Sequence, residues 1–192
     1  MASNRIFVCA DHGLATVYFL QSEIISSLIK AGVEVVLLTD DALKTQIEQR
    51  FGQPGLIVES MRTERLRHYE QTVSPSWQFW LHFLRRAGAS KRINLQAVDG
   101  FISQVRDEAH KKRKLLFPLM KLVVSFLRTN KPARQMLVRY QDRFNPELYV
   151  DLFERYQPVL VVASTPGWRL DRFLLREAKA RRVTTAAVIV GW

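Results

Sequence analysis

Residues 5–40 read RIFVCADHGLATVYFLQSEIISSLIKAGVEVVLLTD, a stretch that predicts a strand, a helix and a second strand. The run at 6–10 is unbroken and apolar, and the run at 33–38 is nearly so, which is typical of parallel strands covered on both faces. Between them, apolar residues recur every three or four positions from Val17 to Ile29, so we expect one helix with a wide apolar face. The stretch therefore predicts an α/β protein with a parallel sheet.

The same alternation of patterns occurs near both ends of the chain. Further apolar runs predict strands at 56–59, 159–163 and 183–190, and a helical pattern precedes each of them. Residues 61–144 carry several helical patterns and no further strand pattern. The sequence thus predicts a Rossmann-like parallel sheet with flanking helices and a helical insertion at about 60–145.

The composition is that of a globular protein with one sizeable core. The chain has 192 residues, 47% of them hydrophobic, and no linker rich in Pro, Gly or Ser, so we expect a single domain over 1–192. Cys9 is the only cysteine, which excludes an intrachain disulfide and favours a reducing compartment. No signal peptide or bilayer-spanning run is recognisable. We expect a cytoplasmic protein, free or peripheral on the inner face of the cell membrane.

The net charge of +11 lies entirely in the middle of the chain. Residues 61–143 contain 18 Lys and Arg against 6 Asp and Glu, whereas the remainder contains 11 against 12. An anionic partner should therefore meet the middle segment. Nucleic acid is the less favoured partner, because the basic residues alternate with long aliphatic runs and no nucleic-acid-binding motif is recognisable.

Two apolar runs in this segment, 77–84 and 115–127, lie beside basic residues. Tryptophan and arginine next to an apolar helix are typical of an element that lies in a membrane interface. The predicted membrane-binding residues are Trp77, Trp80, Arg85, Arg86, Lys111, Lys112, Arg113 and Lys114. The alternative is that both runs are buried helices of a helical subdomain with solvated basic ends.

The loop Asp11-His12-Gly13 follows the first predicted strand, and open α/β sheets bind ligands at the carboxyl ends of their strands. His12 is a candidate general base for a hydroxyl group, with Asp11 orienting its imidazole ring. The alternative is an exposed histidine, or one with a structural hydrogen bond.

No cofactor or metal is expected at this loop. It has one glycine where the dinucleotide fingerprint G-x-G-x-x-G needs three, and the chain has no P-loop. Its four histidines are scattered without the spacing of a metal site. No serine nucleophile elbow occurs, and Cys9 is expected to be buried.

Both ends of the chain resemble the N-terminal half of GT-B-fold glycosyltransferases, especially bacterial surface-polysaccharide enzymes and related glycerophosphotransferase-like proteins. The residues that carry the resemblance are RIFVCADHGLA at 5–15, GVEVVLLT at 32–39, DRFLLREAK at 171–179 and GW at 191–192. In similar proteins a tryptophan at this last place begins a Trp-Asp-Asn loop, so we expect the chain to be part of a longer polypeptide. Two features depart from the pattern: Arg181-Arg182 stands where a glycine usually closes the helix before the last strand, and residues 60–145 carry no recognisable family pattern.

The resemblance implies the acceptor-binding half of an enzyme that transfers a sugar from a nucleotide-sugar donor to an envelope polysaccharide or a lipid-linked acceptor. Some such enzymes place a histidine base in the loop after the first strand, which here is His12. Gly13, Thr165, Gly167 and Trp168 would line the cleft. The donor would be bound mainly by a second half. Two alternatives stay open: transfer of a glycerophosphate unit from an activated nucleotide, and a non-catalytic binding module.

Overall fold

The computed structural model describes residues 4–91, 94–109, 111–165, 167 and 169–188. Contacts between Cα atoms divide the chain into two compact units. The sheet unit comprises residues 1–69 and 145–192, and the helical unit comprises residues 70–144. The prediction of a single domain stays a prediction, whereas the helical insertion is a unit of its own with bounds close to those expected.

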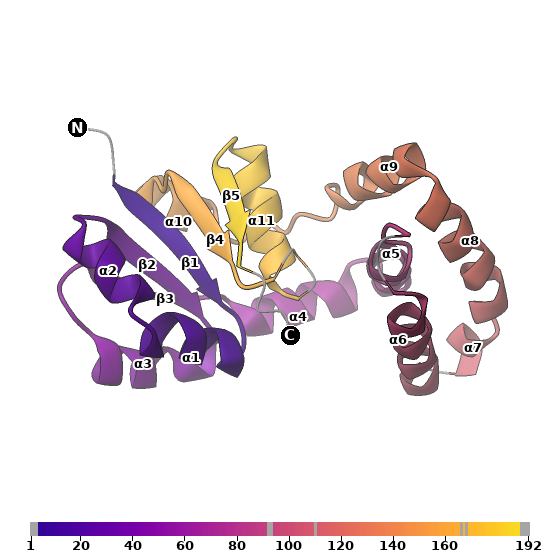
Figure 1. The fold of residues 1–192 in the computed structure, drawn as a ribbon, viewed down its shortest axis with the longest axis horizontal. Helices are drawn as coiled ribbons and strands as arrows, with labels where there is room; N and C mark the ends of the chain where they lie inside the picture. The colour runs from indigo at the N-terminus through magenta and orange to yellow at the C-terminus, as the bar shows by residue number, and fades with distance from the viewer. Residues whose placement is uncertain (1–3, 92–93, 110, 166, 168, 189–192) are drawn as a thin grey trace. The chain divides into compact units, whose positions relative to one another are not determined.

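The sheet unit contains five parallel strands in the order β3-β2-β1-β4-β5 (Figure 1). They are β1 Arg5–Ala10, β2 Glu34–Thr39, β3 Leu56–Ser60, β4 Leu160–Ala163 and β5 Thr184–Ala187. In the register of the central strands, Val8 of β1 lies between Leu37 of β2 and Val162 of β4. The predicted Rossmann-like α/β fold is confirmed. The fifth strand is shorter than predicted, and residues 189 and 190 lie outside the described part of the chain.

Apolar side chains cover both faces of the central strands, as the unbroken run in β1 requires, whereas all four residues of β5 are exposed. Phe7 and Cys9 point into one core, whereas Ile6, Val8 and Ala10 point into the other. The helices of the first face are α4 Thr63–Thr72, α10 Val150–Tyr156 and α11 Asp171–Ala180. Those of the second face are α1 Gly13–Gln21, α2 Ile24–Lys30, the 3-10 turn η1 Asp41–Leu43 and α3 Lys44–Phe51.

The continuous helix that we expected after β1 is in fact two helices, so this prediction was wrong. Ser22 has an extended backbone (φ −89°, ψ 171°), and its Oγ accepts a hydrogen bond from the Ile24 N–H at 3.3 Å. Serine competes in this way with the helical hydrogen bonds of the main chain. The break changes the buried positions, because Phe19 and Ile25 are in the core whereas Val17 is 46% exposed.

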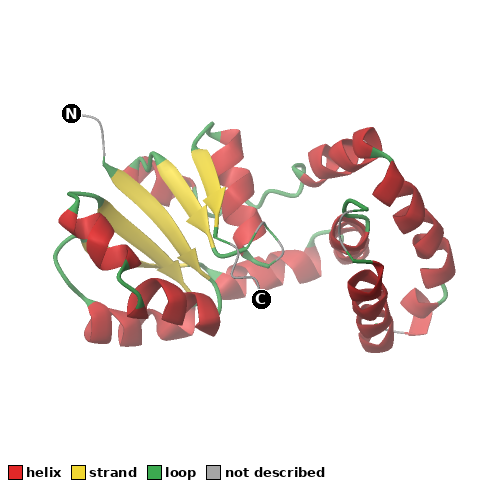
Figure 2. Ribbon diagram, viewed as in Figure 1, coloured by secondary structure: helices red, strands yellow, loops and turns green. Residues whose placement is uncertain are grey.

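The regular elements described in the helical unit are all helices (Figure 2). They are α5 Pro75–Ala87, α6 Leu95–Glu108, α7 Lys111–Lys114, α8 Phe117–Thr129 and α9 Lys131–Gln141. Their shared core contains Phe83 and Ala87 of α5, Ile102 of α6, and Phe117 and Val124 of α8. None of the helices in the described part of the chain is long and apolar enough to cross a bilayer.

Candidate functional site

The candidate site lies where the order of the strands reverses. β1 and β4 are neighbours in the sheet, yet α1, which follows β1, covers one face and α11, which follows β4, covers the other (Figure 1). The two loops therefore separate at the carboxyl ends of adjacent strands. This is the position at which open α/β sheets bind their ligands.

Asp11 and His12 contact each other in the first of these loops. His12 Nδ1 lies 2.7 Å from Asp11 Oδ1, and the Ser164 hydroxyl, from the loop after β4, donates to the same carboxylate oxygen at 2.7 Å. The Asp11 side chain is 1% exposed and that of His12 is 21% exposed. Ser164 fixes the Asp11 carboxylate by its hydrogen bond. The carboxylate in turn orients the imidazole ring of His12 and favours a proton on Nδ1. Nε2 is then the ring nitrogen that can accept a proton.

The main chain of His12 anchors the start of α1. Its backbone is extended (φ −157°, ψ 158°), and its carbonyl accepts hydrogen bonds from the Thr16 N–H at 3.0 Å and the Thr16 hydroxyl at 3.2 Å. Gly13 begins the helix, and a Cβ built on it would meet no atom within 4 Å. The backbone beside the Asp11–His12 pair is therefore not crowded.

The second carboxylate oxygen of Asp11 is buried and has no hydrogen-bond partner among the described residues. Arg169 Nε forms an ion pair with it at 3.9 Å, which is too long for a hydrogen bond. Buried polar atoms are normally satisfied, because an unpaired one costs free energy. Asp11 Oδ2 is therefore an acceptor that a ligand hydroxyl or a shift of the Arg169 side chain would satisfy.

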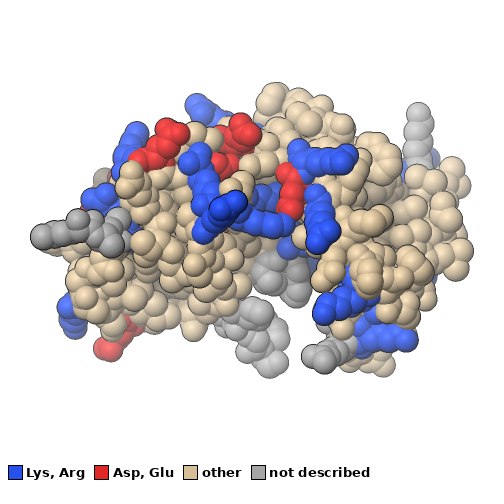
Figure 3. Space-filling model, turned by 90° about the horizontal axis from the view of Figure 1, so that it is seen from above, with Lys and Arg blue, Asp and Glu red and all other residues tan. Residues whose placement is uncertain are grey.

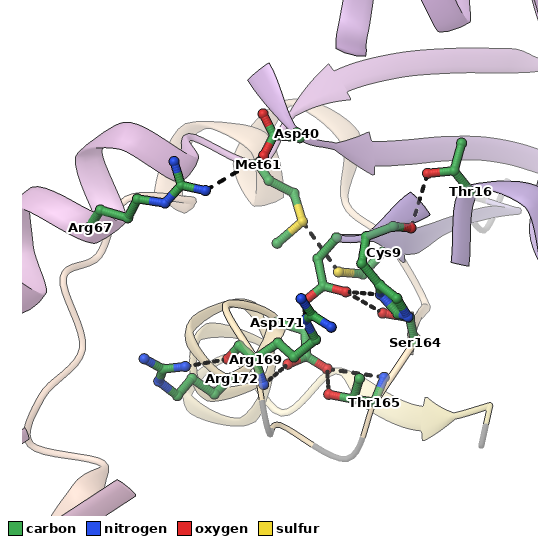
Figure 4. Close-up of polar contacts among 12 residues, drawn as sticks. Cys9, Thr16, Asp40, Met61, Arg67, Ser164, Thr165, Arg169, Asp171 and Arg172 are labelled. Atoms are coloured by element: carbon green, nitrogen blue, oxygen red, sulfur yellow. Dashed lines mark hydrogen bonds and ion pairs between the residues drawn. The ribbon is translucent and has the colours of Figure 1, made fainter. Parts of the chain in front are cut away.

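Asp171 organises the loop after β4 (Figure 4). Its Oδ2 accepts hydrogen bonds from the Thr165 N–H at 3.2 Å and the Thr165 hydroxyl at 2.6 Å, and its Oδ1 accepts one from the Arg169 N–H at 3.1 Å. Burial of the side chain raises the pKa of Asp171. The hydrogen bond from Thr165 opposes this shift, and the charge of Asp11 adds to it. The carboxyl group thus ties the loop to the first turn of α11.

The cleft residues predicted from the resemblance fall into three cases. The Thr165 hydroxyl donates to Asp171, so its proton is already engaged within the protein. Gly167 is buried with φ +78°, a conformation that favours glycine, so it shapes the loop. Trp168 lies outside the described residues. The roles of these residues and of Gly13 in binding a substrate remain predictions.

Arg172 lies in the first turn of α11, and no sequence pattern had selected it. It is 9% exposed, and its guanidinium donates to the carbonyl of Arg169 at 2.5 Å. Burial, followed by the nearby charge of Arg176, lowers the pKa of Arg172 to about 10, and the charge of Asp11 opposes this shift. At neutral pH the group remains cationic and adds positive potential beside Asp11.

Cys9 is buried at the end of β1, as expected. Its thiol donates to Met61 Sδ at 3.4 Å. Burial, followed by the charges of Asp11 and Asp171, raises the pKa of Cys9 well above its usual value. A nucleophilic cysteine needs the opposite shift, so this thiol serves packing. Within the described part of the chain, no three His, Cys, Asp or Glu side chains gather as metal ligands would.

The predicted membrane-binding residues occupy different environments in the helical unit. Trp80 packs edge-on against Phe83 and Phe117, with ring centroids 5.6 Å and 5.2 Å apart, so it belongs to the core. The Arg113 guanidinium lies over the Phe79 ring at 4.4 Å. The exposed members of the set are Trp77, Arg86, Lys111 and Lys114; Arg85 is half-buried, and the side chain of Lys112 is not described. Their membrane role remains a prediction.

Comparisons with protein-family models, with curated proteins and with solved structures find no match for the chain. Inferences about function therefore rest on the fold and on the geometry of the loops after β1 and β4. The resemblance to GT-B glycosyltransferases remains a prediction.

Proposed function

We propose that the loops after β1 and β4 form the acceptor side of a glycosyltransferase, in which His12 is the general base. The observation that carries the proposal is the 2.7 Å contact between His12 Nδ1 and Asp11 Oδ1 at the point where the strand order reverses. An imidazole whose Nδ1–H is held by a carboxylate can accept a proton at Nε2.

In the proposed reaction, Nε2 of His12 takes the proton of an acceptor hydroxyl while the hydroxyl oxygen bonds to the anomeric carbon of a nucleotide sugar. The bond from that carbon to the diphosphate breaks, and the nucleoside diphosphate leaves with the electron pair. The Asp11 carboxylate stabilises the imidazolium that forms. Its hydrogen bond from Ser164 keeps the carboxylate in place during the transfer. A second half of the enzyme supplies most contacts to the donor.

Two further features support an acceptor that carries hydroxyl groups. Asp11 Oδ2 is buried without a hydrogen-bond partner among the described residues, so it can accept a hydrogen bond from a second hydroxyl of the acceptor once the Arg169 side chain or the loop moves to open a path. The exposed Arg169, whose side chain is 55% exposed and 3.9 Å from that oxygen, can move toward a phosphate of a lipid-linked acceptor or of the leaving group. Acceptors of this kind are sugars, polysaccharide ends and lipid-linked saccharides.

The test uses the protein encoded by the complete open reading frame and a panel of nucleotide sugars, with nucleoside diphosphate release as the readout. His12→Ala should lower turnover by at least about 100-fold, the lower range for loss of a general base. His68→Ala, at an exposed histidine of α4, is the matched control and should retain turnover. Wild-type turnover in a folded His12 variant would contradict the proposal. Release of a nucleoside monophosphate from an activated glycerophosphate donor would favour the alternative reaction.

A further inference from the structure

The outer side of α8 is apolar although it faces solvent. Leu119, Leu122 and Phe126 are 55%, 70% and 57% exposed. Their spacing of three and four residues places them on one side of the helix over about 10 Å of its length. The opposite side carries Phe117, Val124 and Leu127, which are buried where α8 packs on α5 and α9. The helix therefore has one apolar side in the core and a second one in water.

All charged residues in the stretch of sequence around this apolar surface are basic. Residues 109–141 contain nine Lys and Arg and no Asp or Glu. The exposed basic residues in this range are Lys111, Lys114, Lys121, Lys131 and Arg139. In the space-filling view, Lys and Arg of the helical unit stand among uncharged surface (Figure 3). Positive charge beside exposed apolar side chains fits a partner that is anionic at its surface and apolar beneath it.

We propose that α8 lies in the interface of an anionic membrane, with Leu119, Leu122 and Phe126 inserted between the acyl chains and the neighbouring lysines among the lipid headgroups. Helices in such interfaces bury an apolar face just below the headgroups and gain electrostatic attraction from basic side chains. The helix does not need to cross the bilayer. All of these residues lie in the helical unit, so the inference is independent of the reaction proposed for the sheet unit.

Charge and apolar area together favour lipid over the other candidate partners. A nucleic acid would neutralise the lysines, but it would leave the three apolar side chains in water. A second copy of the chain would cover them, but residues 70–144 contain 15 Lys and Arg against 5 Asp and Glu, so two such units would repel each other. An anionic bilayer satisfies both requirements at once.

The surface differs from the one expected from sequence. Trp80 and Arg113 were predicted to touch lipid, but the structure packs their side chains on the aromatic core of the unit. The apolar contribution comes from the outer side of α8, which lies within the run 115–127 that was predicted to lie in the interface. Lys111 and Lys114, which were predicted, keep exposed side chains at the start of this surface.

The first experiment needs no variant. Co-sedimentation of the chain with phosphatidylcholine vesicles is compared with co-sedimentation with vesicles that also contain phosphatidylserine. Binding should increase with phosphatidylserine content and weaken as salt is added, because only the electrostatic part is screened. A residual affinity should persist at high salt. The proposal would be overturned if folded protein does not bind phosphatidylserine vesicles at low salt. It would also be overturned if the protein binds single-stranded RNA but no vesicles.

Two variants separate the apolar and electrostatic contributions. Replacing Leu119, Leu122 and Phe126 together by Gln should weaken binding on the order of 100-fold and abolish the salt-resistant part, since transfer of each apolar side chain is worth up to about tenfold. Its matched control is Leu95→Gln with Val159→Gln, at exposed apolar positions 62% and 50% exposed. Circular dichroism checks that each variant is folded.

The second variant replaces Lys111, Lys114, Lys121 and Lys131 by Gln. At low salt it should bind phosphatidylserine vesicles several hundred-fold more weakly, from about fivefold per basic residue, and its remaining affinity should respond less to salt. The matched control removes four exposed charges of the sheet unit, Lys30, Arg65, Lys179 and Arg182, and should change binding far less. Equal losses in both variants would show a general charge effect and overturn the assignment to α8. Loss of a dimer in the apolar variant without loss of vesicle binding would overturn it as well.

Discussion

Replacing Asp171 by alanine should destabilise the sheet unit by about 3–5 kcal/mol. The carboxyl group is fully buried and accepts hydrogen bonds from the Thr165 N–H, the Thr165 hydroxyl and the Arg169 N–H. Each buried donor left without an acceptor costs about 1–3 kcal/mol. The sum is smaller than three separate losses, because the loop can relax and water can reach some of the freed groups.

Urea denaturation followed by far-UV circular dichroism measures this effect. With an m-value of about 3 kcal/mol/M, the midpoint should fall by about 1–1.7 M. Asp171→Asn keeps the shape and one oxygen acceptor of the side chain, so its loss should be intermediate. The matched control is Asp151→Ala, which removes a 53% exposed carboxylate that pairs with Arg62 at 2.6 Å. An exposed ion pair is worth less than about 1 kcal/mol. If both alanine variants lose the same small amount, the account of Asp171 as the anchor of the loop is wrong.

Three further predictions concern glycines, pH and activity. Gly167→Ala should cost about 1–2 kcal/mol in the urea assay, because φ is +78°, whereas Gly13→Ala, where a Cβ meets open space, should leave stability unchanged or raise it by up to about 1 kcal/mol. Burial opposes ionisation of Asp41, but hydrogen bonds from Ser60 and Thr63 outweigh it and lower the pKa of Asp41. Its stabilising contribution is thus present above the unfolded pKa of about 3.9 and is lost as pH falls through the lower folded value, so Asp41→Asn should flatten the acid limb of a stability–pH curve. The 192-residue chain alone should release no nucleoside diphosphate from nucleotide sugars, since the proposed reaction needs a donor half; turnover by this chain would refute the division of roles.

Much of the fold could be predicted from sequence because parallel strands are buried on both faces. That requirement produces runs such as 6–10, which a half-exposed strand or a surface helix does not show. The helical insertion could also be predicted, since residues 61–144 contain no unbroken apolar run of the kind that indicates a buried strand. The break at Ser22 was not, because a single serine in an apolar pattern does not reveal whether its hydroxyl will bond to the main chain.

Only part of the candidate site could be predicted from the sequence. Asp11 and His12 could be selected because a loop after the first strand of such a sheet opens at its ligand-binding edge. Ser164 and Asp171 could not, because 153 positions separate Asp11 from Ser164 and no local pattern marks the contact. Only the pairing of β1 with β4 brings the two loops together. One sequence feature could have pointed to Ser164: polar residues directly follow two of the strands, Asp11 after β1 and Ser164 after β4.

The membrane surface shows most clearly what the sequence determined and what the tertiary structure decided. The absence of acidic residues from 109–141 is a property of the sequence and sets the sign of the partner's charge. Which apolar side chains remain in water depends on packing, because the run 115–127 is apolar nearly all round and can turn either side toward a core. The contacts of α8 with α5 and α9 bury Val124 and Leu127, and they leave Leu122 and Phe126 exposed. Side-chain type determines whether burial is favourable, whereas the position of neighbouring helices determines which side chains are buried.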